Sequence, residues 1–127
     1  MRNFLLVALG LALGVLATFN IINALQRRDA YPRGVMNVMQ HHVAALHEDL
    51  RRQRCGDLGQ EHWLTLRTLA GQIGTAVYRG ETPEPPFREF ETRLADAVAA
   101  TPGDCKALAP ALDRLKAACD DCHRQYR

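Results

Sequence analysis

An apolar stretch near the N-terminus divides this chain into a segment suited to lipid and a remainder suited to water. The stretch runs from Phe4 to about Leu25 and is followed by Gln26, Arg27 and Arg28. Its roughly 22 residues, at about 1.5 Å per helical residue, are enough to cross a bilayer core of about 30 Å. We therefore expect residues 1–27 to form a membrane anchor and residues 31–127 to form one small domain.

Two interpretations of this segment stay open. It is either an uncleaved signal-anchor or a secretory signal peptide cut after residues 15–17, which would release a soluble protein. Cleavage there would leave apolar side chains at the new N-terminus, Phe19 among them, so the anchor is favoured. Arg2 on one side and Arg27 and Arg28 on the other leave the orientation undecided by the positive-inside rule.

Beyond Arg28, apolar residues recur at three- and four-residue spacing, and no alternation with a period of two is long enough for a strand. The pattern predicts four helices, at about Pro32 to Cys55, Gln60 to Arg79, Phe87 to Ala100 and Cys105 to Arg127, with a stiff proline-rich connector before the third. Short loops between them predict an antiparallel up-down-up-down four-helix bundle, separate from the transmembrane helix. Gly71 and Gly74 would either weaken the second helix or allow a close approach to it.

The sequence Cys119-Asp-Asp-Cys122-His123 is a C-x-x-C-H motif, the spacing of c-type haem attachment. Two thiols three residues apart share one face of a helix, where each can form a thioether with one haem vinyl group, and the next residue presents an imidazole to the iron. A zinc site or a redox dithiol is the alternative. The first needs four ligands and the second is usual in a βαβ context, so both are disfavoured.

The ending from Cys119 to Arg127 resembles the C-x-x-C-H-x-x-Y-R terminus of class II c-type cytochromes, the cytochrome c′ and cytochrome c556 family. Residues 35–46 resemble the M-x-x-M-x-x-H-x-x-x-L pattern of that family's first helix. The resemblance covers about residues 31–127. It implies a four-helix bundle with one covalent haem c, bound through Cys119 and Cys122, whose iron has His123 as its proximal ligand.

The resemblance also suggests a sixth iron ligand. The start of the first helix and the end of the fourth should lie at the same pole of an up-down bundle. Met36 aligns with the methionine ligand of the low-spin branch, with Met39 or an open site as alternatives. The family often has an arginine four residues earlier, where this chain has Pro32, so Arg33 is the candidate for a haem propionate contact.

The same topology places Cys55, at the end of the first helix, and Cys105, at the start of the fourth, at the opposite pole. In a chain that leaves the cytoplasm, such a pair tends to form a disulfide, and we expect one here. The alternative is two unpaired buried thiols.

Low-spin His/Met iron favours a membrane-tethered electron carrier, with a redox partner protein in or at the membrane. If Met36 does not bind, the alternative is a high-spin cytochrome c′ that binds nitric oxide or carbon monoxide, and a third hypothesis is a scaffold or sensor in a larger membrane complex. No nucleophile–base pair or acid pair indicates an enzyme. The histidines His41, His42, His47 and His62 are expected to be solvated rather than ligands.

Charge and compartment complete these expectations. A net charge of +2, without a long basic run, argues against nucleic-acid binding. Arg33, Arg124 and Arg127 could steer an acidic partner. Because haem is attached outside the cytoplasm, we expect a single-pass protein of the bacterial inner membrane with its haem domain in the periplasm. The family resemblance implies homodimerisation, which an anchor could replace or oppose.

Overall fold

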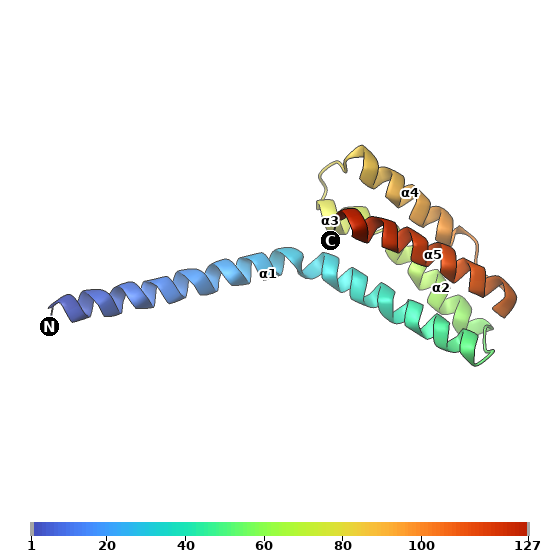
Figure 1. Ribbon diagram of the computed structural model, residues 1–127, viewed down its shortest axis with the longest axis horizontal. Coiled ribbons are helices and arrows are strands. Elements are labelled where there is room, and N and C mark those ends of the chain that lie inside the picture. Colours follow the sequence, from blue (N-terminus) through green and yellow to red (C-terminus); the bar gives the residue numbers. More distant parts are fainter. Residues whose placement is uncertain (1, 127) are drawn as a thin grey trace. The chain divides into compact units, whose positions relative to one another are not determined.

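The computed structural model describes residues 2–126, without the side chains of residues 2, 3, 5, 26–29 and 58. These described residues form α-helices and no strand, which confirms the all-helical prediction (Figure 1). The helices are α1 (Arg2–Arg51), α2 (Asp57–Ala70), α3 (Ile73–Tyr78), α4 (Pro85–Ala99) and α5 (Cys105–Tyr126). The chain divides into two compact units, Met1–Arg33 and Gly34–Arg127.

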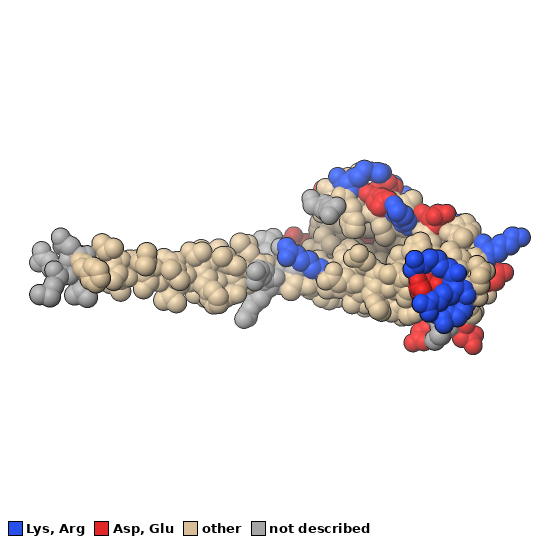
Figure 2. Space-filling model, turned by 60° about the horizontal axis from the view of Figure 1, so that its bottom comes forward, with Lys and Arg blue, Asp and Glu red and all other residues tan. Residues whose placement is uncertain are grey.

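The first unit is the N-terminal part of α1. None of its stretch Leu6–Leu25 is buried, and this stretch is long and apolar enough to cross a membrane, or to act as a signal sequence. Two of its few polar side chains bond to the helix itself: Thr18 Oγ1 donates to the Gly14 carbonyl and Asn20 Nδ2 to the Leu16 carbonyl, both at 2.8 Å. In Figure 2 the long tan part of this helix carries no blue or red side chains, as a segment in lipid requires.

The prediction that the first helix of the domain begins near Pro32 is wrong. A single helix runs from Arg2 to Arg51, with Pro32 inside it. Proline removes one backbone donor from a helix, but no glycine or second proline lies between Leu25 and Pro32 to end it. Pro32 lies next to the boundary between the two units, which falls after Arg33.

The second unit buries one apolar core to which all five helices contribute. The three- and four-residue stripes predicted from the sequence contribute to this core in α4 and α5, through Phe87, Phe90 and Leu94 in α4 and Leu108, Leu112 and Leu115 in α5. The largest fully buried side chains of the unit are Trp63, Phe87, Leu46, Leu66, Ile73, Leu94, Leu115 and Val98.

The predicted second helix is broken in two, which corrects the expectation of one helix from Gln60 to Arg79. The α2 helix ends at Ala70 and α3 begins at Ile73. Gly71 has a low helix propensity and forms the end of α2. Gly74 lies so close to the Glu91 carboxylate of α4 that any Cβ there would collide with it. Gly71 therefore matches the expectation of a weakened helix, and Gly74 the expectation of a close approach.

Helix α4 packs closely against α5 and α2, which lie beside it in Figure 1. The end of α4 is held by two side chains of α2. Trp63 Nε1 and Arg67 Nε donate to the Val98 carbonyl, at 3.3 and 3.1 Å, and Arg67 also donates to the Ala99 carbonyl. These bonds satisfy carbonyl groups that the end of a helix leaves without partners.

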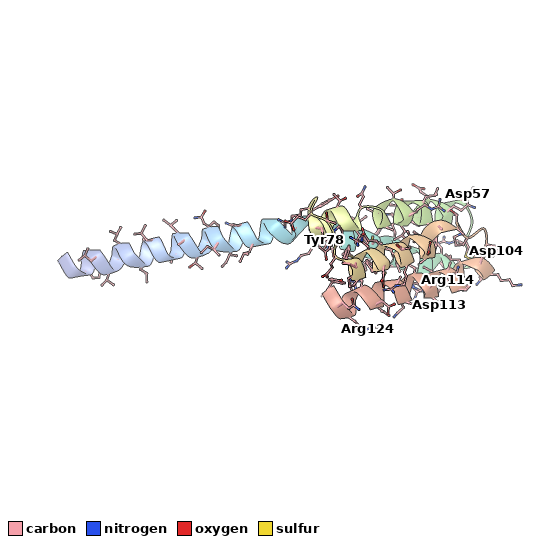
Figure 3. All side chains as sticks on the ribbon, turned by 90° about the horizontal axis from the view of Figure 1, so that it is seen from above. Asp57, Tyr78, Asp104, Asp113, Arg114 and Arg124 are labelled. Atoms are coloured by element: carbon pink, nitrogen blue, oxygen red, sulfur yellow. A yellow bond between two sulfur atoms is a disulfide. The ribbon has the colours of Figure 1, made fainter. Side chains whose placement is uncertain are left out.

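Cys55 and Cys105 form a disulfide, with Cα atoms 5.1 Å apart. Cys55 follows the end of α1, and Cys105 is the first residue of α5. Their neighbours Asp57 and Asp104 lie at one end of the domain in Figure 3, whereas Tyr78 and Arg124 lie toward the other. The disulfide therefore ties α1 to α5 at the end remote from the C-x-x-C-H motif.

Replacing both cysteines, Cys55→Ser with Cys105→Ser, is expected to lower the free energy of unfolding by about 2–4 kcal/mol, because a loop spanning 50 residues is no longer closed in the unfolded chain. Chemical denaturation measures the change. The control is Ala117→Ser, at an exposed position of α5. A double variant that unfolds at the same denaturant concentration as this control would contradict the prediction.

Candidate functional site

The C-x-x-C-H motif lies in the last two turns of α5. Cys119 and Cys122 stand one turn apart on the same face of this helix. The Cys122 side chain is buried, that of Cys119 is half-buried, and His123 is exposed. Both thiols are free, so the only disulfide among the described residues leaves the motif available for other chemistry.

A pocket of about 540 Å³ opens beside the motif, between α1 and α5, with α3 and α4 behind it. Its volume falls within the range of about 300–1,000 Å³ that is usual for small-molecule and cofactor sites. Most of its exposed surface is apolar. Its lining residues are Met36, Met39, Gln40, Val43, His47, Ile73, Phe90, Leu94, Leu115, Lys116, Cys119, Asp120, Cys122 and His123.

The pocket brings Met36 to the same cavity as the three motif residues, as an axial ligand requires. Met36 is half-buried and packs against the core, whereas Met39 is 5% exposed and belongs to the core itself. Met36 therefore has more freedom to turn its sulfur toward the cavity. Whether it binds a metal stays a prediction.

The other predicted residues differ in their relation to this pocket. Arg33 is exposed and belongs to the first unit, so its contact with a propionate stays a prediction. His47 lines the pocket, while His42 and His62 bond to each other. Arg124 pairs with Asp121, so part of its charge is compensated. Arg127 lies outside the described residues.

Burial controls the chemistry of the two thiols. It raises the pKa of Cys122 to about 11, with a smaller contribution from Cys119. The pKa of Cys119 is raised by burial and then by the Asp120 carboxylate, against the opposing effect of Lys116. A reactive dithiol or a zinc thiolate is favoured by a lowered pKa. Because burial shields both thiols and raises the pKa of each, neither a reactive dithiol nor a zinc thiolate is favoured here.

A cluster of aromatic rings supports the last turn of α5, and the sequence analysis missed it. The ring centre of Tyr126 lies 5.2 Å from that of Phe87, which also contacts Tyr78 at 4.7 Å. The Tyr78 hydroxyl donates to Glu84 at 3.4 Å. Burial and Glu84 together raise the pKa of Tyr126 to about 12. The cluster therefore fixes the residues that follow His123 against the start of α4.

Lys116 and Asp120 form an ion pair at 2.5 Å on the α5 side of the pocket. Their four-residue spacing along one helix face could have identified the pair from the sequence. Glu84 could not have been found this way, because it lies far from Tyr126 along the chain.

The residues present fit a covalently attached haem. Two thiols share one helix face, the next residue is an imidazole, and a thioether side chain lines the same, mostly apolar pocket. No cluster of three or more His, Cys, Asp or Glu side chains that could hold a metal ion is found within residues 2–126. A haem needs no such cluster, because the porphyrin supplies the other iron ligands.

Comparison with known proteins identifies no relative: no family model, no curated protein and no solved structure matches this chain.

In protein prepared without haem, we expect alkylation of Cys122 to be slow at neutral pH and to rise about tenfold per pH unit until its pKa, because the thiolate is the nucleophile. That pKa is raised to about 11. Peptide mass spectrometry after iodoacetamide treatment measures the rate at each cysteine.

Asp120→Asn provides the matched control. Loss of the carboxylate should lower the pKa of Cys119 and speed its alkylation near neutral pH. Cys122 should keep its rate, because its pKa is raised by burial and by Cys119. A rate at Cys122 that levels off below about pH 9 would show that its thiol is not shielded.

Proposed function

We propose that this chain is a membrane-tethered class II c-type cytochrome that transfers single electrons. One observation carries the proposal: a single pocket is lined by both cysteines and the histidine of a C-x-x-C-H motif and, across it, by a methionine at the start of the domain. Each of these residue types has a separate role in haem binding. They line one pocket although they are spread along the chain from residue 36 to residue 123.

The proposal includes an up-down-up-down bundle, whose four arms are α1 from Gly34 onward, α2 with α3, α4, and α5. The disulfide supports this arrangement, since it ties the end of α1 to the start of α5. The pocket supports it as well, since Met36 near the start of that arm and His123 near the end of α5 line one cavity. Neighbouring arms of such a bundle run antiparallel.

Each residue would have a definite role toward the haem. The thiols of Cys119 and Cys122 would anchor it through thioether bonds, and the His123 imidazole would bind the iron on one side. Met36 would supply a thioether sulfur on the other side, a soft ligand that raises the reduction potential. When bound, the haem supplies an iron that alternates between the ferric and ferrous states.

The surrounding side chains would tune this chemistry. Phe90, Leu94 and Leu115 line the pocket with apolar surface and exclude water. An apolar environment disfavours the additional positive charge of the ferric state, and so raises the reduction potential. The cluster of Tyr126, Phe87 and Glu84 would hold the turn after His123 and keep the imidazole in place.

The N-terminal helix would anchor the protein in the bacterial inner membrane, with the haem domain in the periplasm, where haem attachment takes place. Leu6–Leu25 supports this by length and composition. Electrons would pass to a partner protein in or at the same membrane. A helix that stays in the bilayer restricts the domain to the membrane surface, which raises its effective concentration near such a partner.

Optical spectra of haem-loaded protein test the role of Met36. We expect wild type to gain the mass of one haem and to show a methionine–iron band near the red edge of the ferric spectrum. Met36→Ala should lose this band, become high-spin and have a lower reduction potential, because the sulfur ligand stabilises the ferrous state. Met39→Ala is the control, since it removes a buried core sulfur from the same helix.

A band that persists in Met36→Ala but disappears in Met39→Ala would assign the ligand to Met39. A high-spin wild type that binds carbon monoxide would support the gas-binding alternative. Colourless protein of unshifted mass, from a host able to attach haem, would exclude the proposal altogether.

Membrane fractionation tests the anchor. Full-length protein is expected to stay with the membranes after alkaline carbonate extraction, because about 20 apolar residues partition into the bilayer core. Residues 29–127 behind a cleavable signal peptide should be soluble and have the same absorption spectrum. A mature chain whose N-terminus begins just after Ala17 would instead show that the segment is a signal peptide.

A further inference from the structure

A pair of histidines joins α1 to α2 outside the haem pocket. Nδ1 of His42 lies 2.8 Å from Nδ1 of His62, and the two ring centres are 5.1 Å apart. Both side chains are half-buried, so solvent can reach the pair. Neither histidine lines the cavity beside the C-x-x-C-H motif. The pair is therefore separate from the residues that would contact the haem.

Two facing imidazole nitrogens can share either a proton or a metal ion. When two imidazoles bind one tetrahedral ion with metal–nitrogen bonds of about 2.0–2.1 Å, their ring centres lie about 5.2 Å apart and their nitrogens about 3.3 Å apart. The ring centres of His42 and His62 already have this spacing. The nitrogens need to separate by only about 0.5 Å. In the hydrogen-bonded arrangement the two nitrogens lie on the line between the ring centres, so each ring must turn by about 35° about its centre before both lone pairs point at one ion.

The surroundings keep these imidazoles ready to bind a cation. Burial lowers the pKa of His42, and the nearby His62 and His41 lower it further, against a smaller opposing effect of Glu61. In a hydrogen bond between two neutral imidazoles one Nδ1 atom carries the proton, so metal binding by both Nδ1 atoms moves that proton to Nε2 of the same ring. Glu61 adds negative charge close to the pair, which favours a bound cation.

We propose that His42 and His62 bind a divalent transition-metal ion, Zn²⁺ or Cu²⁺, through their Nδ1 atoms across the contact between α1 and α2. Imidazole is a preferred ligand of both ions. No group of three or more His, Cys, Asp or Glu side chains that could hold a metal ion is found among the side chains that the structure describes, so we expect water at the remaining positions of the ion. Such a site binds less tightly than one with four protein ligands.

A bound ion would fix the position of the helix that forms one wall of the haem pocket. The same turns of α1 that present His42 to α2 present Met39 and Val43 to that pocket. An ion that binds the folded state alone also stabilises it by mass action. The site would therefore couple metal availability to the rigidity of α1.

The test is a metal titration of full-length protein in detergent, without a polyhistidine tag. Free thiols are alkylated first, so that Cys119 and Cys122 cannot bind the ion in any chain that lacks haem. We expect calorimetry to detect one Zn²⁺ per chain, with binding weakened at least about tenfold by His42→Gln and equally by His62→Gln, because each removes one of two protein ligands. The two substitutions together should have no additional effect.

The control is His47→Gln, which removes a histidine from the pocket side of α1 and should leave Zn²⁺ binding unchanged. Cu²⁺ in the same protein should show electron paramagnetic resonance couplings to two imidazole nitrogens. Circular dichroism verifies that each variant is folded, and His62→Asn provides a second test if His62→Gln is not.

Equal Zn²⁺ affinity in wild type and in both variants would overturn the proposal, as would a loss of affinity in His47→Gln of the same size. These results do not depend on haem. Colourless protein that still binds Zn²⁺ through His42 and His62 would refute the proposed cytochrome function and support the metal site.

Discussion

The cavity between α1 and α5 is the feature on which the arrangement of the domain's functional residues depends. Helix α4 packs closely against α5 and α2, whereas α1 has no comparably close packing with another helix among the described residues. Met36, Met39 and Val43 line one side of the gap, and the turn from Cys119 to His123 lines the other. A protein interior is normally packed without voids larger than a water molecule, so a cavity of this size is suited to a bound group. The proposed haem would complete the packing between the two helices.

Much of the fold could be predicted because most of the information is local. The stripes of α4 and α5, the proline-rich start of α4 and its end at Ala99 follow from periodicity and turn chemistry alone. The break after Ala70 could not be located, because two glycines offer several places for it. Close to the break, Gly74 of α3 lies against the Glu91 carboxylate of α4. Such a contact between helices cannot be predicted from a local sequence pattern.

The residues that would contact a haem could be predicted from the sequence, whereas the side chains that support them could not. A motif of five residues identifies the thiols and the imidazole, and bundle topology brings Met36 toward them. The bond between Tyr78 and Glu84 and that between His42 and His62 join polar side chains of ordinary sequence context. Isolated polar residues are usually solvated, so neither pairing could be predicted. The pairing of His42 with His62 depends on how α1 packs against α2, and that of Tyr78 with Glu84 on the connection between α3 and α4. The shape of the pocket depends on helix packing in the same way.

The loose packing of α1 gives the disulfide and the proposed haem complementary roles. The disulfide fastens the end of α1 to the start of α5, at one end of the domain. An iron bound by both His123 and Met36 would fasten the start of this arm to the end of α5, at the other end. A domain of about 100 residues has a small core and gains from such cross-links. The disulfide lies at the opposite end of this arm from Met36, so the proposed iron would add a second link between α1 and α5 where the first does not reach.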